Sequence, residues 1–100
     1  MMAGYEEHIT EDARLVILRS LVKQRDFTLN ETILKAALDA FGHRRSREWL
    51  RTQIRKLEEL EAVTVTEAGS VLVARITNAG IDHIELRGTI EGVARPSPGG

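Results

Sequence analysis

Basic side chains gather in one short part of this 100-residue chain. Residues 44–56 contain five arginines and one lysine against a single glutamate. The rest of the chain holds eight basic and fourteen acidic residues, and the formal net charge is −1. A local excess of cations on an acidic body is the distribution that favours contact with phosphate groups.

A helix is expected to carry most of this basic segment. Leu50, Ile54 and Leu57 recur at the spacing of one helix face, and Ser46 is a good N-cap before them. At about 100° per residue, Arg51 and Arg55 then point away from the buried stripe. The outward face of this helix is therefore the candidate contact surface.

Outward arginines on such a helix have a defined use in the recognition of double-stranded DNA. Arg51 and Arg55, one turn apart, can each donate two hydrogen bonds to guanine, and Thr52 can contact a thymine methyl group or a phosphate. Arginines at the helix start neutralise phosphates. The predicted DNA-contact residues are Arg44, Arg45, Ser46, Arg47, Arg51, Thr52 and Arg55.

Two features oppose this interpretation, and an ordinary solvated helix face is the alternative. Glu59 can pair with Lys56 on the helix surface. The later turn, residues 68–70, brings no cation, and Glu67 beside it would repel phosphate. Because one copy would bury little DNA surface, the DNA hypothesis also requires a homodimer, which we expect to form through the first and last helices.

Other chemistry is not indicated. The chain has no cysteine, which excludes disulfides and thiol chemistry. His8, His43 and His83 are scattered without ligand spacing, so we expect no metal. No Gly-rich phosphate loop, nucleophile elbow or HExxH motif appears, so we expect neither enzyme activity nor a cofactor.

The sequence also predicts the compartment. The longest apolar run, Leu15 to Leu18, is far shorter than the roughly 20 residues that a membrane helix needs. The first residues, MMAGYEEH, are acidic, unlike a signal peptide. We therefore expect a cytoplasmic protein with no membrane contact.

Apolar periodicity predicts the elements that position the basic face. Helices are expected at about 10–25, 30–41, 46–60 and 78–87, and strands at about 27–29, 63–66 and 71–76. Thr10 is the expected cap of the first helix. The second helix can be capped by Thr28, with Glu31 completing a capping box, or by Asn30. Its predicted inner stripe, which Gly42 should end, is Ile33, Leu34, Ala37, Leu38 and Phe41.

The folded domain is expected to span residues 1–88. The last twelve residues, TIEGVARPSPGG, hold both prolines of the chain and three glycines, and predict a flexible tail at 89–100. The order of the predicted elements is that of a winged helix-turn-helix. This is an α+β, mostly α class with a three-helix core, a two-stranded wing and a C-terminal helix.

Several short motifs resemble known regulators of this class. Leu57-Glu58-Glu59-Leu60 followed by Val63-Thr64-Val65 is similar to the end of the third helix and the entry into the wing in MarR-like and ArsR-like proteins. Ile76-Thr77-Asn78-Ala79-Gly80 resembles the Leu-Thr-x-x-Gly signature that follows their wing. The resemblance implies the same fold.

The whole chain also resembles a family of small proteins encoded in Mu-like prophages. The likeness rests on Tyr5-Glu6-Glu7-His8, Arg14 to Leu18, Leu29-Asn30-Glu31, Ala40-Phe41-Gly42-His43 and Val93-x-Arg95-Pro96. It implies a phage origin and a transcriptional regulator that inserts its third helix into the DNA major groove.

A protein–protein module in phage packaging or head assembly is the alternative function. Trp49 and the arginines would then face a protein. Trp49 lies at the margin of the predicted buried stripe, where sealing the core edge is the favoured role and an interface contact the other.

Overall fold

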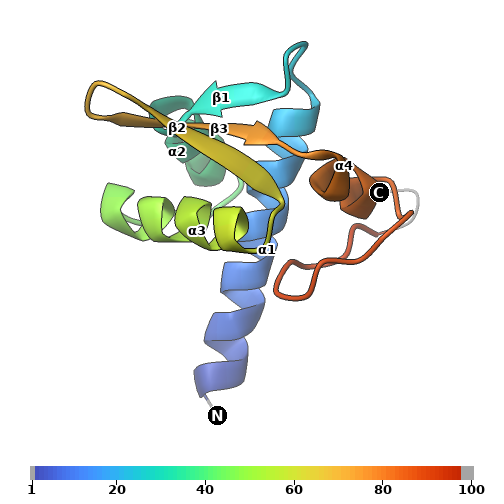
Figure 1. The fold of residues 1–100 in the computed structure, drawn as a ribbon. Helices are drawn as coiled ribbons and strands as arrows, with labels where there is room; N and C mark the ends of the chain where they lie inside the picture. Colours follow the sequence, from blue (N-terminus) through green and yellow to red (C-terminus); the bar gives the residue numbers. More distant parts are fainter. Residues whose placement is uncertain (1, 98–100) are drawn as a thin grey trace.

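The computed structural model describes residues 2–97, with side chains from residue 4 onward. Its elements are α1 (Met2–Val22), β1 (Thr28–Asn30), α2 (Glu31–Ala40), α3 (Arg47–Glu59), β2 (Val63–Ala68), β3 (Val71–Ile76) and α4 (Asn78–Ile84). The strands form one antiparallel sheet in the order β1-β3-β2. The β2–β3 hairpin follows α3 (Figure 1), which confirms the α+β, mostly helical winged-helix prediction.

The sheet contains one strand more than the wing itself. β1 pairs with β3, so that Thr28 lies opposite Arg75 and Asn30 lies opposite Val73. Gly69 in the tight turn between β2 and β3 has a φ of 63°, which glycine adopts without steric cost. Because β1 leads directly into α2, the start of α2 is held beside the wing.

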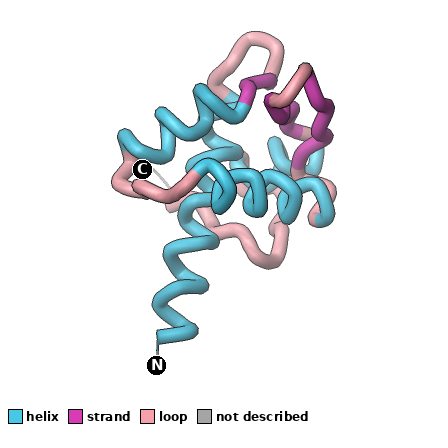
Figure 2. Tube along the Cα trace, turned by 90° about the vertical axis from the view of Figure 1, so that its left-hand side faces the viewer, coloured by secondary structure: helices cyan, strands magenta, loops and turns pink. Residues whose placement is uncertain are grey.

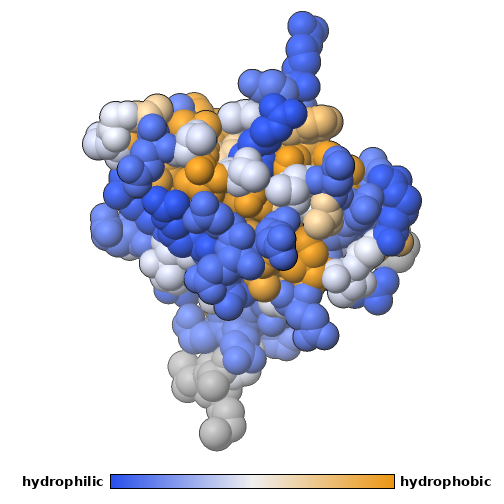
Figure 3. All heavy atoms as spheres, viewed as in Figure 1, coloured by the Kyte–Doolittle hydropathy of each residue, from blue (hydrophilic) through white to orange (hydrophobic). Residues whose placement is uncertain are grey.

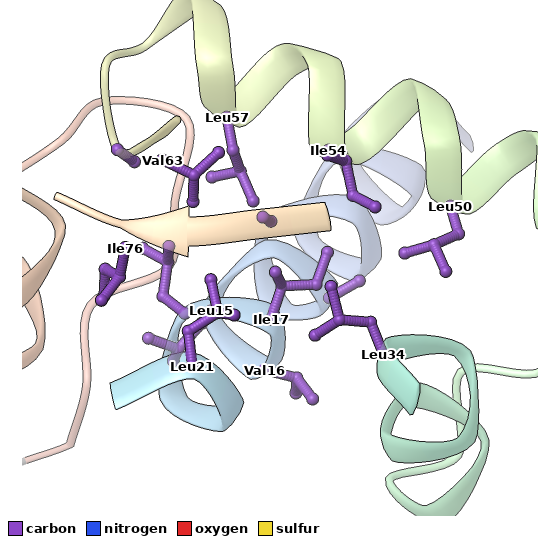
Figure 4. Packing of buried hydrophobic residues seen from close by; sticks show 14 of the residues in the cluster. Leu15, Val16, Ile17, Leu21, Leu34, Leu50, Ile54, Leu57, Val63 and Ile76 are labelled. Carbon is purple, nitrogen blue, oxygen red and sulfur yellow. The ribbon is translucent and has the colours of Figure 1, made fainter. Parts of the chain in front are cut away.

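The core lies between the helices and one face of the sheet. Leu50, Ile54 and Leu57 are at most 1% exposed. In Figure 4 they extend from α3 toward β3 and toward Ile17 of α1. Complete burial of one such side chain stabilises a fold by about 1.5–3 kcal/mol. The predicted stripe of α3 is thus confirmed, and it fixes which face of this helix points outward.

Side-chain caps define where three helices begin. The side chains of Asn30, Ser46 and Thr77 accept hydrogen bonds from backbone N–H groups at the starts of α2, α3 and α4, over 2.9, 3.0 and 3.2 Å. Of the two predicted caps for α2, the structure uses Asn30. Glu31 therefore occupies the first position of α2 and does not complete a capping box with Thr28.

α1 starts before its predicted cap at Thr10, so that prediction was wrong. The Thr10 hydroxyl donates to the carbonyl oxygen of Glu6 within the helix, over 2.8 Å. Glu6 and Asp12 pair with Arg45 and His43 of the α2–α3 turn, over 3.0 and 2.7 Å. These long-range pairs hold the early turns, which project from the body of the molecule in Figures 1 and 2.

The predicted inner stripe of α2 is only half correct. Leu34 and Leu38 are buried, whereas Ile33 is 49% and Phe41 63% exposed. The core covers a narrow side of α2 around Leu34 and Leu38, and Ile33 is rotated by about 100° from Leu34. Phe41 lies beyond the last helical residue, at the C-cap.

α4 ends earlier than predicted, at Ile84 instead of near Arg87. Leu86 adopts a left-handed conformation with a φ of 62°. Its side chain is 42% exposed and does not extend an apolar helix face. The chain turns at this point and runs back toward α1 (Figure 1).

Residues 89–97 differ from the flexible tail predicted for 89–100. Val93 is only 5% exposed, and the N–H of Ala94 donates to the carbonyl oxygen of Glu11 in α1, over 3.1 Å. His83 Nε2 donates to the Ala94 carbonyl oxygen over 2.9 Å, while its Nδ1 accepts from the N–H of Ile90 over 3.0 Å. Burial of apolar residues outweighs a composition that favours disorder. The remainder of the predicted tail, 98–100, lies outside the described residues.

The face of the molecule seen in Figure 3 is mostly hydrophilic, with apolar patches between the charged side chains. Among the described residues, none of the helices combines the length and the apolar character needed to cross a membrane.

Candidate functional site

The first residue of α2, Glu31, is fully buried and lies beneath the predicted contact face, where it pairs with Arg47 and Arg51. Arg51 donates to its carboxylate from Nε over 2.8 Å and from Nη2 over 3.0 Å. Arg47 donates to it from Nη1 over 3.1 Å, and the backbone N–H of Leu72 in β3 is a further donor. One carboxylate therefore joins α2, α3 and the sheet.

The environment of Glu31 keeps its carboxylate ionised. Burial alone would raise the pKa of Glu31, because a buried carboxylate loses its hydration. The hydrogen bonds from Arg51, Leu72 and Arg47 outweigh burial, and the pKa lies below its ordinary value. The hydrogen bonds between Arg51 and Glu31 also raise the pKa of Arg51. A fixed negative charge thus sits directly behind two of the predicted DNA-contact arginines.

Two arginines of α3 also contact the wing. Nη2 of Arg51 donates to the carbonyl oxygen of Ser70 in the wing turn. Arg55 donates from Nη1 to Glu58 and from Nη2 to Glu67 of β2, each over 3.0 Å. These contacts fasten the outward face of α3 to the wing, and they engage both terminal nitrogens of Arg55.

Arg45 and Ser46, which precede α3, have structural partners too. Arg45 pairs with Glu6 and lies over the ring of Trp49, 4.7 Å from its centroid. Trp49 is half-buried and packs against the core, which agrees with the favoured core-edge role. Ser46 is the N-cap, so its hydroxyl already accepts a backbone hydrogen bond.

Two of the predicted contact residues, Thr52 and Arg44, make no side-chain hydrogen bond or ion pair with another element of the described chain. Thr52 is exposed, and its hydroxyl donates to the carbonyl oxygen of Glu48 over 3.1 Å. Arg44 is exposed and has no ion pair within residues 4–97. It lines a shallow pocket with Lys35, Asp39 and Arg45.

The charges on the α3 face nearly cancel. An open groove of about 660 Å³ runs along this face. Its charged lining residues are Arg14, Arg51, Arg55 and Lys56 together with Glu48, Glu59 and Glu67. The sequence of residues 44–56 showed an excess of cations, but folding brings carboxylates from α1, α2 and β2 against them.

Sequence reasoning missed Glu31 as the organising residue of this site. The available signal was the pair Arg47 and Arg51, which lie four residues apart on one face of α3 and follow a helix that begins with a glutamate. Gln53 was also missed: it is 4% exposed and accepts a hydrogen bond from Arg14 of α1 over 2.9 Å. Both residues connect α3 to its neighbours.

Within the described part of the chain, no group of three or more His, Asp or Glu side chains could hold a metal ion. What the site offers is a mixed-charge surface of hydrogen-bond donors and acceptors, supported by a fixed network.

Comparison with known proteins gives two relatives of this chain. An uncharacterized protein, gp26, of Escherichia phage Mu is 46% identical over 90 residues, which cover 90% of this chain and 93% of gp26. An uncharacterized protein of Haemophilus influenzae is 39% identical over 75 residues, 74% of this chain and 72% of that protein. No family model matches the chain, and no solved structure matches it. The identity and coverage show that this chain, a small winged-helix-like protein, belongs to the family of phage Mu gp26.

Proposed function

We propose that the chain is a protein-binding winged-helix module of Mu-like phages, whose α3 face recognises a protein surface of mixed charge. The observation that carries this proposal is the ion pairing of the arginines on α3. Arg47 and Arg51 share the buried Glu31, and Arg55 is held between Glu58 and Glu67.

A bidentate contact with guanine would compete with the present carboxylate partners of Arg51 and Arg55. A bidentate contact uses two N–H groups of one guanidinium. In Arg51, Nε and Nη2 are engaged by Glu31, and in Arg55 both terminal nitrogens are engaged by glutamates. The exposed pairs of Arg55 are worth about 0.2–1 kcal/mol each and can open, whereas breaking a buried pair costs about 3–5 kcal/mol.

The net charge of the face also favours a protein partner. Helix α3 carries four cationic and three carboxylate side chains, and Glu31 and Glu67 place two further carboxylates beside its arginines. Non-specific attraction to DNA arises from an excess of cations that displaces counterions. A balanced set of donors and acceptors, with arginines and Trp49 among them, suits recognition of another protein.

Titration with duplex DNA checks the electrostatic part of this proposal. At about 0.15 M salt the wild-type chain is expected to bind duplex no more tightly than about 10⁻⁴ M, the weak end of non-specific binding. The Glu58→Gln/Glu67→Gln variant, which releases Arg55, should bind more tightly and show a log K against log salt slope steeper by about 1. Fluorescence anisotropy measures both quantities.

The opposite pattern would contradict the proposal. In that pattern the wild-type chain binds duplex DNA with micromolar or tighter affinity, and log K changes with log salt with a slope of several units. Arg55→Ala then clearly weakens binding while the circular dichroism spectrum of the variant matches that of the wild type.

Capture from cells in which a Mu-like phage replicates tests the protein partner. The immobilised chain is expected to retain a phage-encoded protein, identified by mass spectrometry. Thr52→Glu places a charge at the exposed centre of the face and should reduce capture at least about tenfold, since an unpaired charge at an interface costs more than 1.4 kcal/mol. Ala79→Glu, an exposed site on α4, is the matched control. Equal capture by the two variants would refute a role for the α3 face.

Sequence-specific DNA binding by a transcriptional regulator is the second candidate. One observation favours it: the side chains of Arg47, Arg51 and Arg55 keep 35–45% exposure on the helix that a winged helix-turn-helix inserts into the major groove. In that case Glu31 would serve to orient the arginines. The DNA titration separates the two candidates.

A further inference from the structure

Strand β2 lies at an edge of the sheet. The strand order β1-β3-β2 leaves its outer side without a neighbouring strand among the described residues (Figure 1). The unpaired N–H and C=O groups along such an edge are a template for a further strand. β2 has six residues, VTVTEA, and the first four are β-branched. Proline and lysine, which commonly protect exposed edges, are absent from it.

The hydrogen bonds of β3 identify which backbone groups of β2 point outward. Ile76 bonds toward β1, because its N–H donates to the carbonyl oxygen of Phe27 over 3.0 Å. Its partner in β2, Val63, therefore belongs to a pair that is not hydrogen-bonded. Bonded and non-bonded pairs alternate along an antiparallel ladder, so Val65 and Glu67 are in non-bonded pairs too. The N–H and C=O groups of these three residues point away from β3.

The open part of this edge begins at Val65. Val63 is only 2% exposed, so its backbone is covered. Val65 is half-buried and Glu67 is exposed. Within the described residues, no turn, cap or side-chain hydrogen bond engages the N–H or C=O groups of Val65 and Glu67. A further strand can therefore pair with both backbone groups of each residue.

A groove of about 500 Å³ continues the edge from Val65 toward the start of β2 and the start of α4. Val63, Val65 and Ala79 contribute apolar surface to it, and its charged lining residues are both glutamates, Glu58 and Glu61. The side chain of a lysine or arginine has a matching chemistry, because its apolar stem packs on apolar surface while its charged end stays near water and carboxylates.

The β2 edge carries more negative than positive charge. Glu58, Glu61 and Glu67 lie along it, and Arg55 pairs with Glu58 and Glu67. Glu61 is exposed, and its carboxylate makes no ion pair in the part of the chain that the structure describes. Arg75 of β3 lies one strand in from the edge. The uncompensated charge at this edge therefore favours a cationic partner.

We propose that an extended segment of a partner protein, with a lysine or arginine at its end, adds to the sheet alongside β2. Its backbone pairs with Val65 and Glu67, and its cation enters the groove and contacts Glu58 and Glu61. In this mode of recognition, main-chain hydrogen bonds supply affinity and side-chain pockets supply specificity. The inference goes beyond the proposed function, because it does not depend on which macromolecule the outward face of α3 contacts.

Charge disfavours a second copy of this chain as the occupant of the edge. If two β2 strands paired in antiparallel orientation through their outer edges, Glu67 of each copy would lie opposite a valine that lines the groove of the other. Glu58 and Glu61 line the same groove. Like charges brought together at an interface are unfavourable.

Hydrogen exchange measured by NMR with the synthetic peptide KTVTVTK tests the proposal. With a lysine at each end, the peptide can place one in the groove in either strand orientation. Saturating peptide should slow exchange of the Val65 and Glu67 amides at least about tenfold, because they gain hydrogen-bond partners. The amides of Thr64 and Thr66 already bond to β3 and should change little. Unchanged exchange at Val65 and Glu67 would overturn the proposal.

Charge variants test the groove. At about 0.05 M salt, where screening is weak, Glu61→Lys should weaken binding of KTVTVTK about fivefold, because repulsion replaces an attraction. Glu7→Lys changes the net charge equally at an exposed position of α1 and should bind like the wild type. Chemical-shift titration measures both affinities, and circular dichroism verifies that each variant is folded.

Two further results would overturn the proposal. One is binding of ETVTVTE as tightly as KTVTVTK, or equal effects of Glu61→Lys and Glu7→Lys, since the partner would then not be recognised by its cation. The other is protection of Val65 and Glu67 that rises with the concentration of the chain alone, because a second copy would then occupy the edge.

Discussion

Replacing Glu31 by glutamine is expected to lower the free energy of unfolding by about 2 kcal/mol at neutral pH. The substitution keeps the shape of the side chain but removes the charge that Arg47 and Arg51 both contact. Because position 31 is fully buried, the glutamine side chain cannot replace the lost charged hydrogen bonds by hydrogen bonds to water. Urea unfolding of the variant and the wild type measures the difference.

The pH dependence of this difference follows from the lowered pKa of Glu31. A carboxyl group whose pKa is lower in the folded than in the unfolded state stabilises the fold above its unfolded value, about 4.3 for glutamate. That stability is lost as the pH falls through the folded pKa. The wild type should therefore lose its advantage over Glu31→Gln below about pH 4.3 and keep it at higher pH.

Glu48→Gln is the matched control for Glu31→Gln. Glu48 is an exposed glutamate on α3, and its replacement should change the unfolding free energy by no more than about 0.5 kcal/mol. Equal effects of the two substitutions at pH 7 would show that the Glu31 network does not hold α2, α3 and the sheet together.

Gly80→Ala is expected to destabilise the fold by about 2 kcal/mol, although alanine is the better helix former. A Cβ atom at this position of α4 would lie 2.6 Å from the carbonyl oxygen of Ala62 and 2.6 Å from Cγ1 of Ile76. A backbone carbonyl cannot move aside as a flexible side chain can. Thermal unfolding should show a loss of roughly 10 °C, since 1 kcal/mol corresponds to about 4–8 °C in a domain of this size.

Gly88→Ala provides the comparison for Gly80→Ala. The nearest atom to a Cβ at Gly88 is Cβ of Asp82, at 3.6 Å, which is ordinary van der Waals contact. The melting temperature of this variant should stay near that of the wild type. If Gly80→Ala were as stable as Gly88→Ala, α4 would not pack as closely against Ala62 and Ile76 as the structure shows. The close packing of α4 at Gly80 also gives a physical reason for the glycine in the Ile76–Gly80 motif.

The elements that sequence reasoning predicted well are those whose signals are local. The stripe of Leu50, Ile54 and Leu57 and the N-cap at Ser46 placed α3 correctly, because a helix period and a cap depend on residues a few positions apart. The turn at Gly69 between two alternating segments likewise predicted the wing hairpin.

The elements that were mispredicted depend on distant partners. The early turns of α1 are held by Arg45 and His43, some thirty to forty residues away in the chain. Residues 89–97 look disordered by composition, but Val93 finds an apolar site that another part of the chain supplies. Neither partner can be identified from a window of neighbouring residues.

The candidate site shows the same division. The residues that Ser46 and the leucine stripe orient outward, including Arg51, Thr52 and Arg55, followed from the sequence. Their electrostatic state did not, since the position of Glu31 and Glu67 relative to α3 is set by the packing of α2 and the wing. A charge count along the chain adds up neighbours in sequence, but a Coulomb interaction depends on neighbours in space.

The amino-acid sequence by itself determined the winged-helix architecture and the outward face of α3, because periodicity, caps and turns act over a few residues. Only the tertiary structure decided that the arginines of that face are neutralised and that α2 keeps an apolar side uncovered. Both outcomes depend on which distant surfaces meet when the helices pack against the sheet.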